Sequence, residues 1–526
     1  MTRTQATLPS LIRTNALKHP NAEAVDGTTY SDFQDLSDRY VARLTPTGIQ
    51  KGDSVCLMFT NKSVHAVALA LAIMRLGATY VPLSSTFPEE RLSKQCRTLG
   101  DALKLVLYGH EEADRSRAEA VGHTLDIAAR SIDSVRSEPE DRNTTTDVSA
   151  WDDLALVLFT SGSTGPPKAT GWKHRHLIAS LEACTATFGL GSTTRVCNVV
   201  PYVWDAANLD VFGALLRGGT VVFAHDMTAA GIARTIAEKR CTYMVGPSSL
   251  LQTIPVDSLA KLDVLVSGGE GTSAAQFREW IEKLAPKTRL FNGYGLTETG
   301  VGNIAWECPP DFPGDMETIP LGLPFGNNDA VIEEETGEIV VSGPQVTEGY
   351  IGVESPTFVA PPSAYSNEHW ALRTGDIGWK DEEGRFYIKG RLDDRLSIAS
   401  LRIEQAETEA AALKVPEVDF AHLFVHELGE GLAPSLVLAY HVSGTPSTEG
   451  SLSGDEYASY SDNHEKRLRA QMQVSVPGYQ RPSSYIPLGS IPRTISQKKD
   501  AKRIASLAAE LHEGGLVKFS PFDGAM

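Results

Sequence analysis

The stretch Leu158-Phe-Thr-Ser-Gly-Ser-Thr-Gly-Pro-Pro-Lys168 joins the end of an apolar run to small hydroxyl residues and glycines, and it closes on a lysine. Glycines let backbone N–H groups approach phosphate oxygens, and hydroxyl groups add further donors. The lysine supplies a point charge. Its spacing differs from that of a Walker A loop. The stretch therefore predicts a phosphate-binding loop after a buried strand, with a flexible surface loop as the alternative.

The composition limits the classes of partner that this chain can have. It has 526 residues, 41% hydrophobic and 22% charged, with a formal net charge of −18. This length exceeds what one compact core holds, so we expect two or more domains. The negative charge repels nucleic acid and anionic membrane surfaces, so we expect neither as a partner.

The cysteines and apolar segments indicate a cytoplasmic protein. The six cysteines are scattered without CxxC pairs or metal-ligand spacing, so we expect buried thiols in a reducing compartment. The N-terminal residues lack the apolar core of a secretory signal. The longest apolar stretch, residues 66–74, is too short to span a bilayer and is predicted to be a core helix.

Short apolar runs separated by helical patterns recur along the N-terminal part of the chain. Those predicted to be strands are residues 53–59, 80–83, 104–108, 155–159, 195–200, 220–223, 243–245 and 264–266. Strands that alternate with helices indicate layered α/β sheets with many parallel pairings. Further on, residues 379–390 predict a β-hairpin with its turn at residues 381–384.

The pattern changes after residue 390. A helix is predicted at residues 403–413 and strands at 419–425 and 435–442, and the Ser, Gly and Thr of residues 443–463 predict a loop. We therefore expect a large N-terminal domain of layered α/β sheets, residues 1–392, and a small mobile α+β C-terminal domain, residues 393–526.

Further strings occur in the order in which one known superfamily has them. They are Gly77-Ala-Thr-Tyr-Val-Pro-Leu83, Asn292-Gly-Tyr-Gly-Leu-Thr-Glu298, Gly337-Glu-Ile-Val-Val-Ser-Gly343, Arg373-Thr-Gly-Asp376, Gly390-Arg-Leu-Asp393, Arg402-Ile-Glu404 and Ile491-Pro-Arg-Thr-Ile-Ser-Gln-Lys498. On these strings the chain resembles the adenylate-forming (ANL) superfamily of acyl-CoA synthetases, luciferases and adenylation domains of nonribosomal peptide synthetases, and most of all the last. The resemblance runs over nearly the whole chain. It implies ATP- and Mg2+-dependent activation of a carboxylic acid with release of pyrophosphate.

The same resemblance implies roles for the residues that match the family's motifs. Glu298 would coordinate Mg2+ and Thr297 would contact the α-phosphate, while Lys168 would hold phosphate. Lys498 would be the catalytic lysine that bridges the carboxylate and the α-phosphate, favouring the transition state; an ordinary surface lysine is the alternative. Asp393 would be the hinge of the C-terminal domain.

The nucleotide site is implied in the same way. Tyr294 would stack on adenine beside Asn292 and Gly293, Asp376 would accept hydrogen bonds from the ribose hydroxyls, and Arg391 would hold the ribose and phosphate side. The phosphate loop would contribute Thr160, Ser161, Gly162, Ser163, Thr164 and Gly165.

The acid is narrowed by the string Tyr202-Val-Trp-Asp-Ala-Ala-Asn-Leu-Asp-Val-Phe212, which resembles the part of amino-acid-activating domains that holds the α-ammonium group. Asp205 stands at that position, with a helix cap as the alternative, whereas its rival Asp210 is predicted to lie on an ordinary helix surface. The implied side-chain pocket is uncharged: Ala206, Leu209, Val245, Val266, Gly268, Gly293, Val301 and Gly302. Several glycines make it apolar and roomy, so we expect a bulky hydrophobic or aromatic amino acid.

The acceptor of the adenylate is less well defined. Where the family carries basic residues and a glycine, this chain has Ser397, Ala399 and Ser400, and Gln497 replaces the glycine before Lys498. The first hypothesis is a peptidyl carrier protein thiol as acceptor, with the carrier acting in trans or absent from an excised domain. The second is an amine that yields an amide, and an aryl or acyl acid ligase remains a further alternative. A degenerate, non-catalytic family member is disfavoured because Lys168, Glu298, Asp376 and Lys498 are all present.

Overall fold

The computed structural model describes residues 6–137, 147–160, 167–272, 274–284, 286–311, 318–392, 396–398, 401–403, 405–428, 433–443, 454–492, 501–515 and 517–522. Contacts divide the chain into two compact units, with the boundary after Asp393. Unit 1 holds most of the chain up to that residue. Unit 2 holds the residues beyond it together with residues 86–94.

The first sheet of unit 1 has the strand order β6-β5-β3-β4-β7-β8 and is parallel except for β8, which runs antiparallel to β7. Its strands are β3 (Ser54–Met58), β4 (Thr79–Leu83), β5 (Leu103–Tyr108), β6 (Ala128–Ser131), β7 (Leu154–Thr160) and β8 (Lys168–Lys173). Every residue of β3 and β4 is buried, as expected where helices cover both faces of a parallel sheet. The strands predicted in this region are confirmed.

Helices before and around this sheet include one that is apolar on all sides. The helices are α1 (Leu8–Lys18), α2 (Tyr30–Leu44), α3 (Val64–Arg75), α5 (Glu112–Leu125), α6 (Ile132–Arg136) and α7 (His174–Phe188). Helix α4 (Glu89–Arg97) begins in the residues that belong to unit 2. In α3 every residue from Ala66 to Arg75 is buried, so it is a core helix as its composition predicts. Within the described residues, no helix is both long and apolar enough to cross a membrane.

The second sheet of unit 1 has the order β15-β14-β13-β12-β11-β9-β10-β1-β2. Its strands are β1 (Glu23–Val25), β2 (Thr28–Thr29), β9 (Arg195–Asn198), β10 (Thr220–Phe223), β11 (Tyr243–Gly246), β12 (Val264–Gly268), β13 (Arg289–Tyr294), β14 (Ile304–Glu307) and β15 (Leu323–Pro324). The run from β13 to β1 is parallel. Its strands therefore end at one edge, where ligands bind in open α/β sheets.

The helices that follow these strands are short. They are α8 (Ala206–Asn208), α9 (Ala214–Leu216), α10 (Ala229–Glu238), α11 (Ser248–Leu251), α12 (Val256–Leu259) and α13 (Ala274–Leu284). Between α8 and α9 the chain forms a π-helical turn, Leu209–Gly213. One large apolar core links both sheets through α1, α2, α3 and α7.

A third, antiparallel sheet completes unit 1 and has its own core. Its strands are β16 (Asp329–Ile332), β17 (Glu338–Ser342), β18 (Phe358–Val359), β19 (Ala371–Lys380) and β20 (Phe386–Arg391). The hairpin of β19 and β20 has the predicted turn, in which Gly384 N donates to Asp381 O at 3.0 Å. A bridge between Gly322 and Phe386 joins this sheet to the segment before β15.

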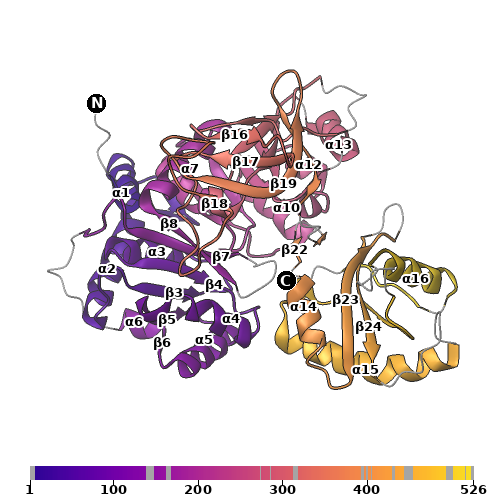
Figure 1. The fold of residues 1–526 in the computed structure, drawn as a ribbon. Coiled ribbons are helices and arrows are strands. Elements are labelled where there is room, and N and C mark those ends of the chain that lie inside the picture. Colours follow the sequence, from indigo (N-terminus) through magenta and orange to yellow (C-terminus); the bar gives the residue numbers. More distant parts are fainter. Residues whose placement is uncertain are drawn as a thin grey trace. The chain divides into compact units, whose positions relative to one another are not determined.

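Unit 2 is an α+β structure around the pairing of β23 and β24 (Figure 1). Its elements are β21 (Ser397–Ile398), β22 (Leu401–Arg402), α14 (Gln405–Ala412), β23 (Val418–His426), β24 (Ser435–Val442), α15 (Gly454–Ser475), β25 (Ser484–Pro487) and α16 (Ala501–Glu513). The predicted loop at residues 443–463 is wrong from Gly454 onward, where α15 begins. Its polar first turns hid the helix, because the buried Leu468, Met472 and Val476 that mark its period come late.

The six cysteines lie buried and form no disulfide, which confirms that they are buried thiols.

Gly322 is a glycine that the junction of the second and third sheets requires. Its φ is +104°, and a Cβ there would lie 1.9 Å from the Ala305 backbone oxygen, whereas Gly384, with φ +78°, faces open space. We expect Gly384→Ala to lower the free energy of unfolding by about 1 kcal/mol, the strain of a left-handed backbone. Gly322→Ala should lose about 2 kcal/mol more, because the backbone must also move. Urea unfolding measures both, and equal losses would contradict the steric reason.

Candidate active site

The strand and the lysine that flank the predicted phosphate loop form an antiparallel hairpin. Thr160 ends β7 and pairs with Lys168, which begins β8. Residues 155–158 of β7 are buried, which anchors the base of the hairpin. Lys168 Nζ lies 4.9 Å from the centroid of the Tyr350 ring. The loop residues Ser161, Gly162, Ser163, Thr164 and Gly165 lie outside the described residues, so their contacts stay a prediction.

Glu298 occupies a turn that directly follows the carboxyl end of β13. Thr297–Thr299 is a 3-10 turn, and Glu298 is 4% exposed. Tyr350 donates a hydrogen bond from its hydroxyl to Glu298 Oε1 at 2.7 Å. Within the described part of the chain, the second carboxylate oxygen, Oε2, is buried without a hydrogen-bond partner.

A buried carboxylate oxygen without a donor is costly unless a cation accompanies it. Glu298 is therefore chemically suited to hold Mg2+, which prefers hard oxygen ligands. No group of three or more His, Cys, Asp or Glu side chains in the described residues could hold a metal by itself. Mg2+ in proteins is usually bound through one or two carboxylates, with phosphate oxygens and water completing its ligands.

The residues implied in binding adenosine are brought together from two sheets. Tyr294, at the end of β13, donates from its hydroxyl to Asp376 Oδ2 at 2.6 Å. Asp376 lies on β19 and is 4% exposed, and its backbone pairs with Arg391 on β20. Asn292 donates from its side-chain amide to Pro320 O at 2.8 Å. Tyr294 and Asp376 belong to separate sequence motifs, and only the fold brings their side chains into contact.

Asp205 is tied to the turn that carries Glu298. Thr297 Oγ1 donates to Asp205 Oδ2 at 2.6 Å. Asp205 precedes α8, but its side chain makes no capping hydrogen bond there. The helix-cap alternative therefore lacks support, and the carboxylate instead reaches across to the neighbouring element.

The predicted position of Asp210 is wrong, because this residue lies in the core and not on a helix surface. It is 0% exposed, within the π-helical turn, and Asn198 donates to its Oδ2 at 2.8 Å. Burial raises the pKa of Asp210 to about 8. Burial lowers the pKa of Lys62 to about 8 against the opposing attraction of Asp210, and its Nζ donates to Asn198 O at 3.1 Å.

The sequence itself contained an indication that Asp210 is buried. Asp210 interrupts the apolar run from Leu209 to Leu216. If such a run is buried, its acidic residue needs a hydrogen-bond or charge partner, which Asn198 supplies here.

The residues of the predicted side-chain pocket lie on neighbouring elements at one edge of the second sheet. Val245 on β11 pairs with Val266 on β12, and Gly268 pairs with Gly293 on β13. A Cβ at Gly268 would lie 3.1 Å from Gly293 O, and one at Gly293 would lie 3.3 Å from Val266 Cγ1. These glycines therefore allow close strand packing as well as leaving space.

Two side chains that the sequence analysis did not predict, Phe325 and Cys184, lie next to Gly302. A Cβ at Gly302 would lie 3.4 Å from Phe325 Cζ and 3.8 Å from Cys184 Sγ. Burial raises the pKa of the Cys184 thiol to about 12, and Asp205 adds to the rise. Cys184 belongs to α7, which no motif links to the site. Of the other predicted lining residues, Leu209 is buried and Ala206 and Val301 are partly exposed.

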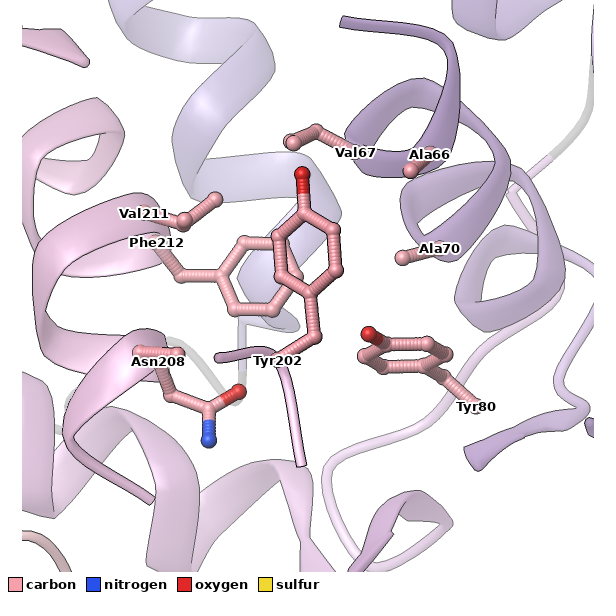
Figure 2. Close-up of a pocket in the computed structure, with 9 residues that line it drawn as sticks. Ala66, Val67, Ala70, Tyr80, Tyr202, Asn208, Val211 and Phe212 are labelled. Atoms are coloured by element: carbon pink, nitrogen blue, oxygen red, sulfur yellow. The ribbon is translucent and has the colours of Figure 1, made fainter. Parts of the chain in front are cut away.

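A small cavity lies next to the Asp205 segment, between α3 and the π-helical turn (Figure 2). Its volume is about 10 Å³, room for a single water molecule and far less than an amino acid needs. Figure 2 shows the rings of Tyr80, Tyr202 and Phe212 around it. This cavity is a packing gap in the core and is not the substrate pocket.

The remaining predicted residues lie outside the described part of the chain. These are the catalytic lysine Lys498, the hinge Asp393, and Ser400 with Ala399 in the altered loop. Arg391 is described only through its backbone, at the end of β20.

The fold is that of an α/β protein whose candidate site lies at the carboxyl ends of parallel strands. A family model for AMP-binding enzymes matches residues 12–351. The chain therefore belongs to the AMP-binding enzyme family. It is an adenylate-forming, acid–AMP ligase type of enzyme, of the kind found as adenylation domains in nonribosomal peptide synthetases.

Sequence relatives agree with this assignment. The chain is 28% identical to syringomycin synthase SyrB1 of Pseudomonas syringae pv. syringae over 93% of its own length and 79% of that protein. It is 27% identical to tyrocidine synthase 3 of Brevibacillus parabrevis over 95% of its length. It spans only 8% of that second protein, so it corresponds to one part of a much longer synthetase.

Solved structures share the fold. An artificially fused adenylation–PCP di-domain, NpsA-ThdA from Klebsiella oxytoca, has a TM-score of 0.77 at 20% identity, covering 99% of this chain and 100% of that one. The amide bond synthetase McbA from Marinactinospora thermotolerans has a TM-score of 0.79 at 20% identity, covering 95% and 99%. These likenesses confirm the predicted adenylate-forming fold.

The charge interaction between Lys62 and the buried Asp210 generates a pH-dependent prediction. Without Lys62, the pKa of Asp210 should rise further, because the attraction of the Lys62 cation, which lowers it, is lost. Between the unfolded and folded pKa values the folded state holds the extra proton, so stability falls as pH rises. For Lys62→Met this fall continues above pH 8, whereas in the unchanged chain it ends near there.

We therefore expect the free energy of unfolding of Lys62→Met, relative to that of the unchanged chain, to fall between pH 6 and pH 9. Above pH 8 the variant still loses stability through Asp210, whereas the unchanged chain regains stability as Lys62 loses its proton, and each effect contributes up to about 1.4 kcal/mol per pH unit. Urea unfolding at the two pH values measures this gap. Lys261→Met, at an exposed lysine, is the matched control. A gap that is the same at both pH values would contradict the pairing.

Proposed function

We propose that this chain uses ATP and Mg2+ to activate a bulky hydrophobic or aromatic amino acid as aminoacyl-AMP, and passes it to the phosphopantetheine thiol of a carrier protein. A carboxylate oxygen of the amino acid attacks the α-phosphorus, the bond to the bridging oxygen breaks, and pyrophosphate leaves. The thiol then attacks the acyl carbon, and AMP leaves.

The hydrogen bond between Thr297 and Asp205 carries this proposal. In an α-amino acid a single carbon separates the ammonium group from the carboxylate. The partner of the ammonium must therefore lie next to the group that meets the α-phosphate. Thr297 Oγ1 stands 2.6 Å from Asp205 Oδ2, as this requirement demands. A plain fatty or aryl acid would have no use for a carboxylate there.

The chain's own residues would bind the metal, the phosphates and the adenosine, and would supply the catalytic charge. Mg2+, when bound, neutralises phosphate charge and assists the departure of pyrophosphate. Glu298 would hold it through Oε2, and Lys168 would neutralise phosphate oxygens. Asp376 would accept hydrogen bonds from the ribose hydroxyls, and Tyr294 would stack on adenine. Lys498 would supply the positive charge between the carboxylate and the α-phosphate.

The pocket supports the choice of side chain. Val245, Val266 and Leu209 present no charge, so an ionised substrate side chain would lose its hydration without gaining a partner. A pyrophosphate-exchange screen over the amino acids and aryl acids tests the assignment. We expect tyrosine, phenylalanine or tryptophan to give the highest exchange, then leucine or valine.

An amine acceptor is the second candidate. The replacement of basic residues and glycine by Ser397, Ala399 and Ser400 favours it, because a side chain at Ser400 would narrow the path of a pantetheine thiol. The chain also shares its fold with an amide bond synthetase. Offering the enzyme a holo-carrier protein, free amines and hydroxylamine in separate reactions distinguishes the two. Product on the carrier supports the first candidate, and amide formed at rates near those with hydroxylamine supports the second.

Asp205→Ala should weaken the amino acid selectively. Loss of a charged hydrogen bond costs about 1.5–3 kcal/mol, so KM for the amino acid should rise by about 10- to 100-fold. KM for the corresponding des-amino acid should not change. Asp35→Ala, which removes an exposed carboxylate on α2, is the control and should leave KM for both acids unchanged. Pyrophosphate exchange with both acids measures this. If both acids lose equally, Asp205 does not bind the ammonium group.

Lys498→Ala should lower the exchange rate by about 10³-fold or more while ATP binding persists, because the lysine acts mainly in the transition state. Lys499→Ala is the adjacent control and should stay close to the unchanged chain. Exchange kinetics and calorimetric ATP binding together measure the two effects. A normal exchange rate for Lys498→Ala would remove this lysine from the mechanism.

A further inference from the structure

The segment of residues 345–351, called the strap below, links the two halves of the phosphate machinery. Thr347 donates from its backbone N and from its hydroxyl to Glu298 O, at 3.0 and 3.2 Å. Ile351 N donates to Ala169 O at 2.9 Å, and Tyr350 forms a bridge with Thr170. The strap is therefore bonded at one end to the turn that carries Glu298 and at the other to the strand that begins at Lys168.

Tyr350 is the strap residue whose side chain contacts both functional groups. Its hydroxyl donates to Glu298 Oε1 at 2.7 Å, and its ring lies 4.9 Å from Lys168 Nζ. Phe358 packs edge-on against the ring with centroids 5.0 Å apart, which limits its rotation. Gly349, with φ +123°, makes the turn that brings Tyr350 into this position.

The strap is also held from outside the site. Glu348 accepts a hydrogen bond from Lys173 Nζ at 2.6 Å and another from Arg175. These charged contacts attach the strap to β8 and to the start of α7. Tyr350 is therefore supported by the residues on either side of it.

The geometry points to Tyr350 as a positioning residue for adenylation: its hydroxyl occupies one oxygen of Glu298 and leaves the other for Mg2+, while its ring holds the Lys168 ammonium. This inference rests on the proposed function, in which Glu298 and Lys168 serve Mg2+ and phosphate. A hydroxyl that orients a ligating carboxylate fixes the direction of its second oxygen and so raises metal affinity. The aromatic face attracts the ammonium group without neutralising it, so its charge remains available to phosphate.

Two substitutions separate the contributions of the hydroxyl and the ring. Tyr350→Phe removes the hydroxyl and keeps the ring. Tyr350→Leu removes both. Tyr108→Phe is the matched control, because the Tyr108 hydroxyl donates to Glu119 Oε1 at 3.2 Å elsewhere in unit 1.

Calorimetric binding of α,β-methylene-ATP, an analogue that cannot transfer its AMP group to an acid, is measured with and without Mg2+. We expect Tyr350→Phe to raise the Mg2+ concentration for half-maximal binding by about 10-fold, the usual effect of losing a partner of a metal ligand. Its affinity for the metal-free analogue should be unchanged. Tyr350→Leu should weaken metal-free binding as well, by about 3-fold, as expected for the loss of a partly exposed cation–π contact. Tyr108→Phe should match the unchanged chain in every measurement.

The double variant Glu298→Gln/Tyr350→Phe tests whether the Tyr350 hydroxyl acts through Glu298. If the hydroxyl acts through Glu298, the double variant should bind no more weakly with Mg2+ than Glu298→Gln alone. Additive losses, or a Tyr350→Phe variant whose Mg2+ dependence is unchanged, would overturn the inference. Because the analogue undergoes no reaction, its binding is measured independently of catalysis. If the unchanged chain exchanged pyrophosphate with no acid, the proposed function would be refuted, but the binding test of Tyr350 would still stand.

Discussion

Three carboxylates of the candidate site have been taken largely out of water, and each accepts a hydrogen bond from a hydroxyl group on a different element. Thr297 donates to Asp205, Tyr350 to Glu298 and Tyr294 to Asp376, at 2.6 to 2.7 Å. A carboxylate in such surroundings is destabilised unless donors or cations compensate it, so these hydroxyls hold the acids in place while supplying no charge of their own. In the proposed function these acids serve the ammonium group, the metal and the ribose, respectively.

This arrangement depends on the edge where the parallel strands of the second sheet end. Gly268 on β12 and Gly293 on β13 pair there in register, and the turn with Thr297 and Glu298 follows β13 directly. Two other parts of unit 1 supply partners: β19 provides Asp376, and the segment with Tyr350 lies between the phosphate-loop strand and the Glu298 turn. The residues proposed to bind the acid, the nucleotide and the metal are therefore joined through backbone connections, which limit how far any one of them can shift.

Sequence patterns were informative wherever a local rule governs the structure. The apolar runs that became β3, β4, β7, β11 and β12 are short, flanked by helical patterns and buried, so their strand assignment needed no distant information. Two interpretations were wrong. Asp210 was placed on a surface although it is buried and accepts a hydrogen bond from Asn198, and such burial is decided by segments that pack from elsewhere in the chain. The start of α15 was taken for a loop because its first turns are polar and its apolar residues come late.

The sequence by itself determined the family, the order of the strands along the chain and the identity of the acids and bases, because short motifs and apolar periodicity are local properties. Tertiary structure alone decided which hydroxyl meets which carboxylate. Thr297 and Asp205 are 92 residues apart, Tyr350 and Glu298 are 52 apart, and Tyr294 and Asp376 are 82 apart. No spacing rule connects positions so distant. Their pairing arises when the sheets pack and the carboxylates lose water, and only then does the burial that requires a donor exist.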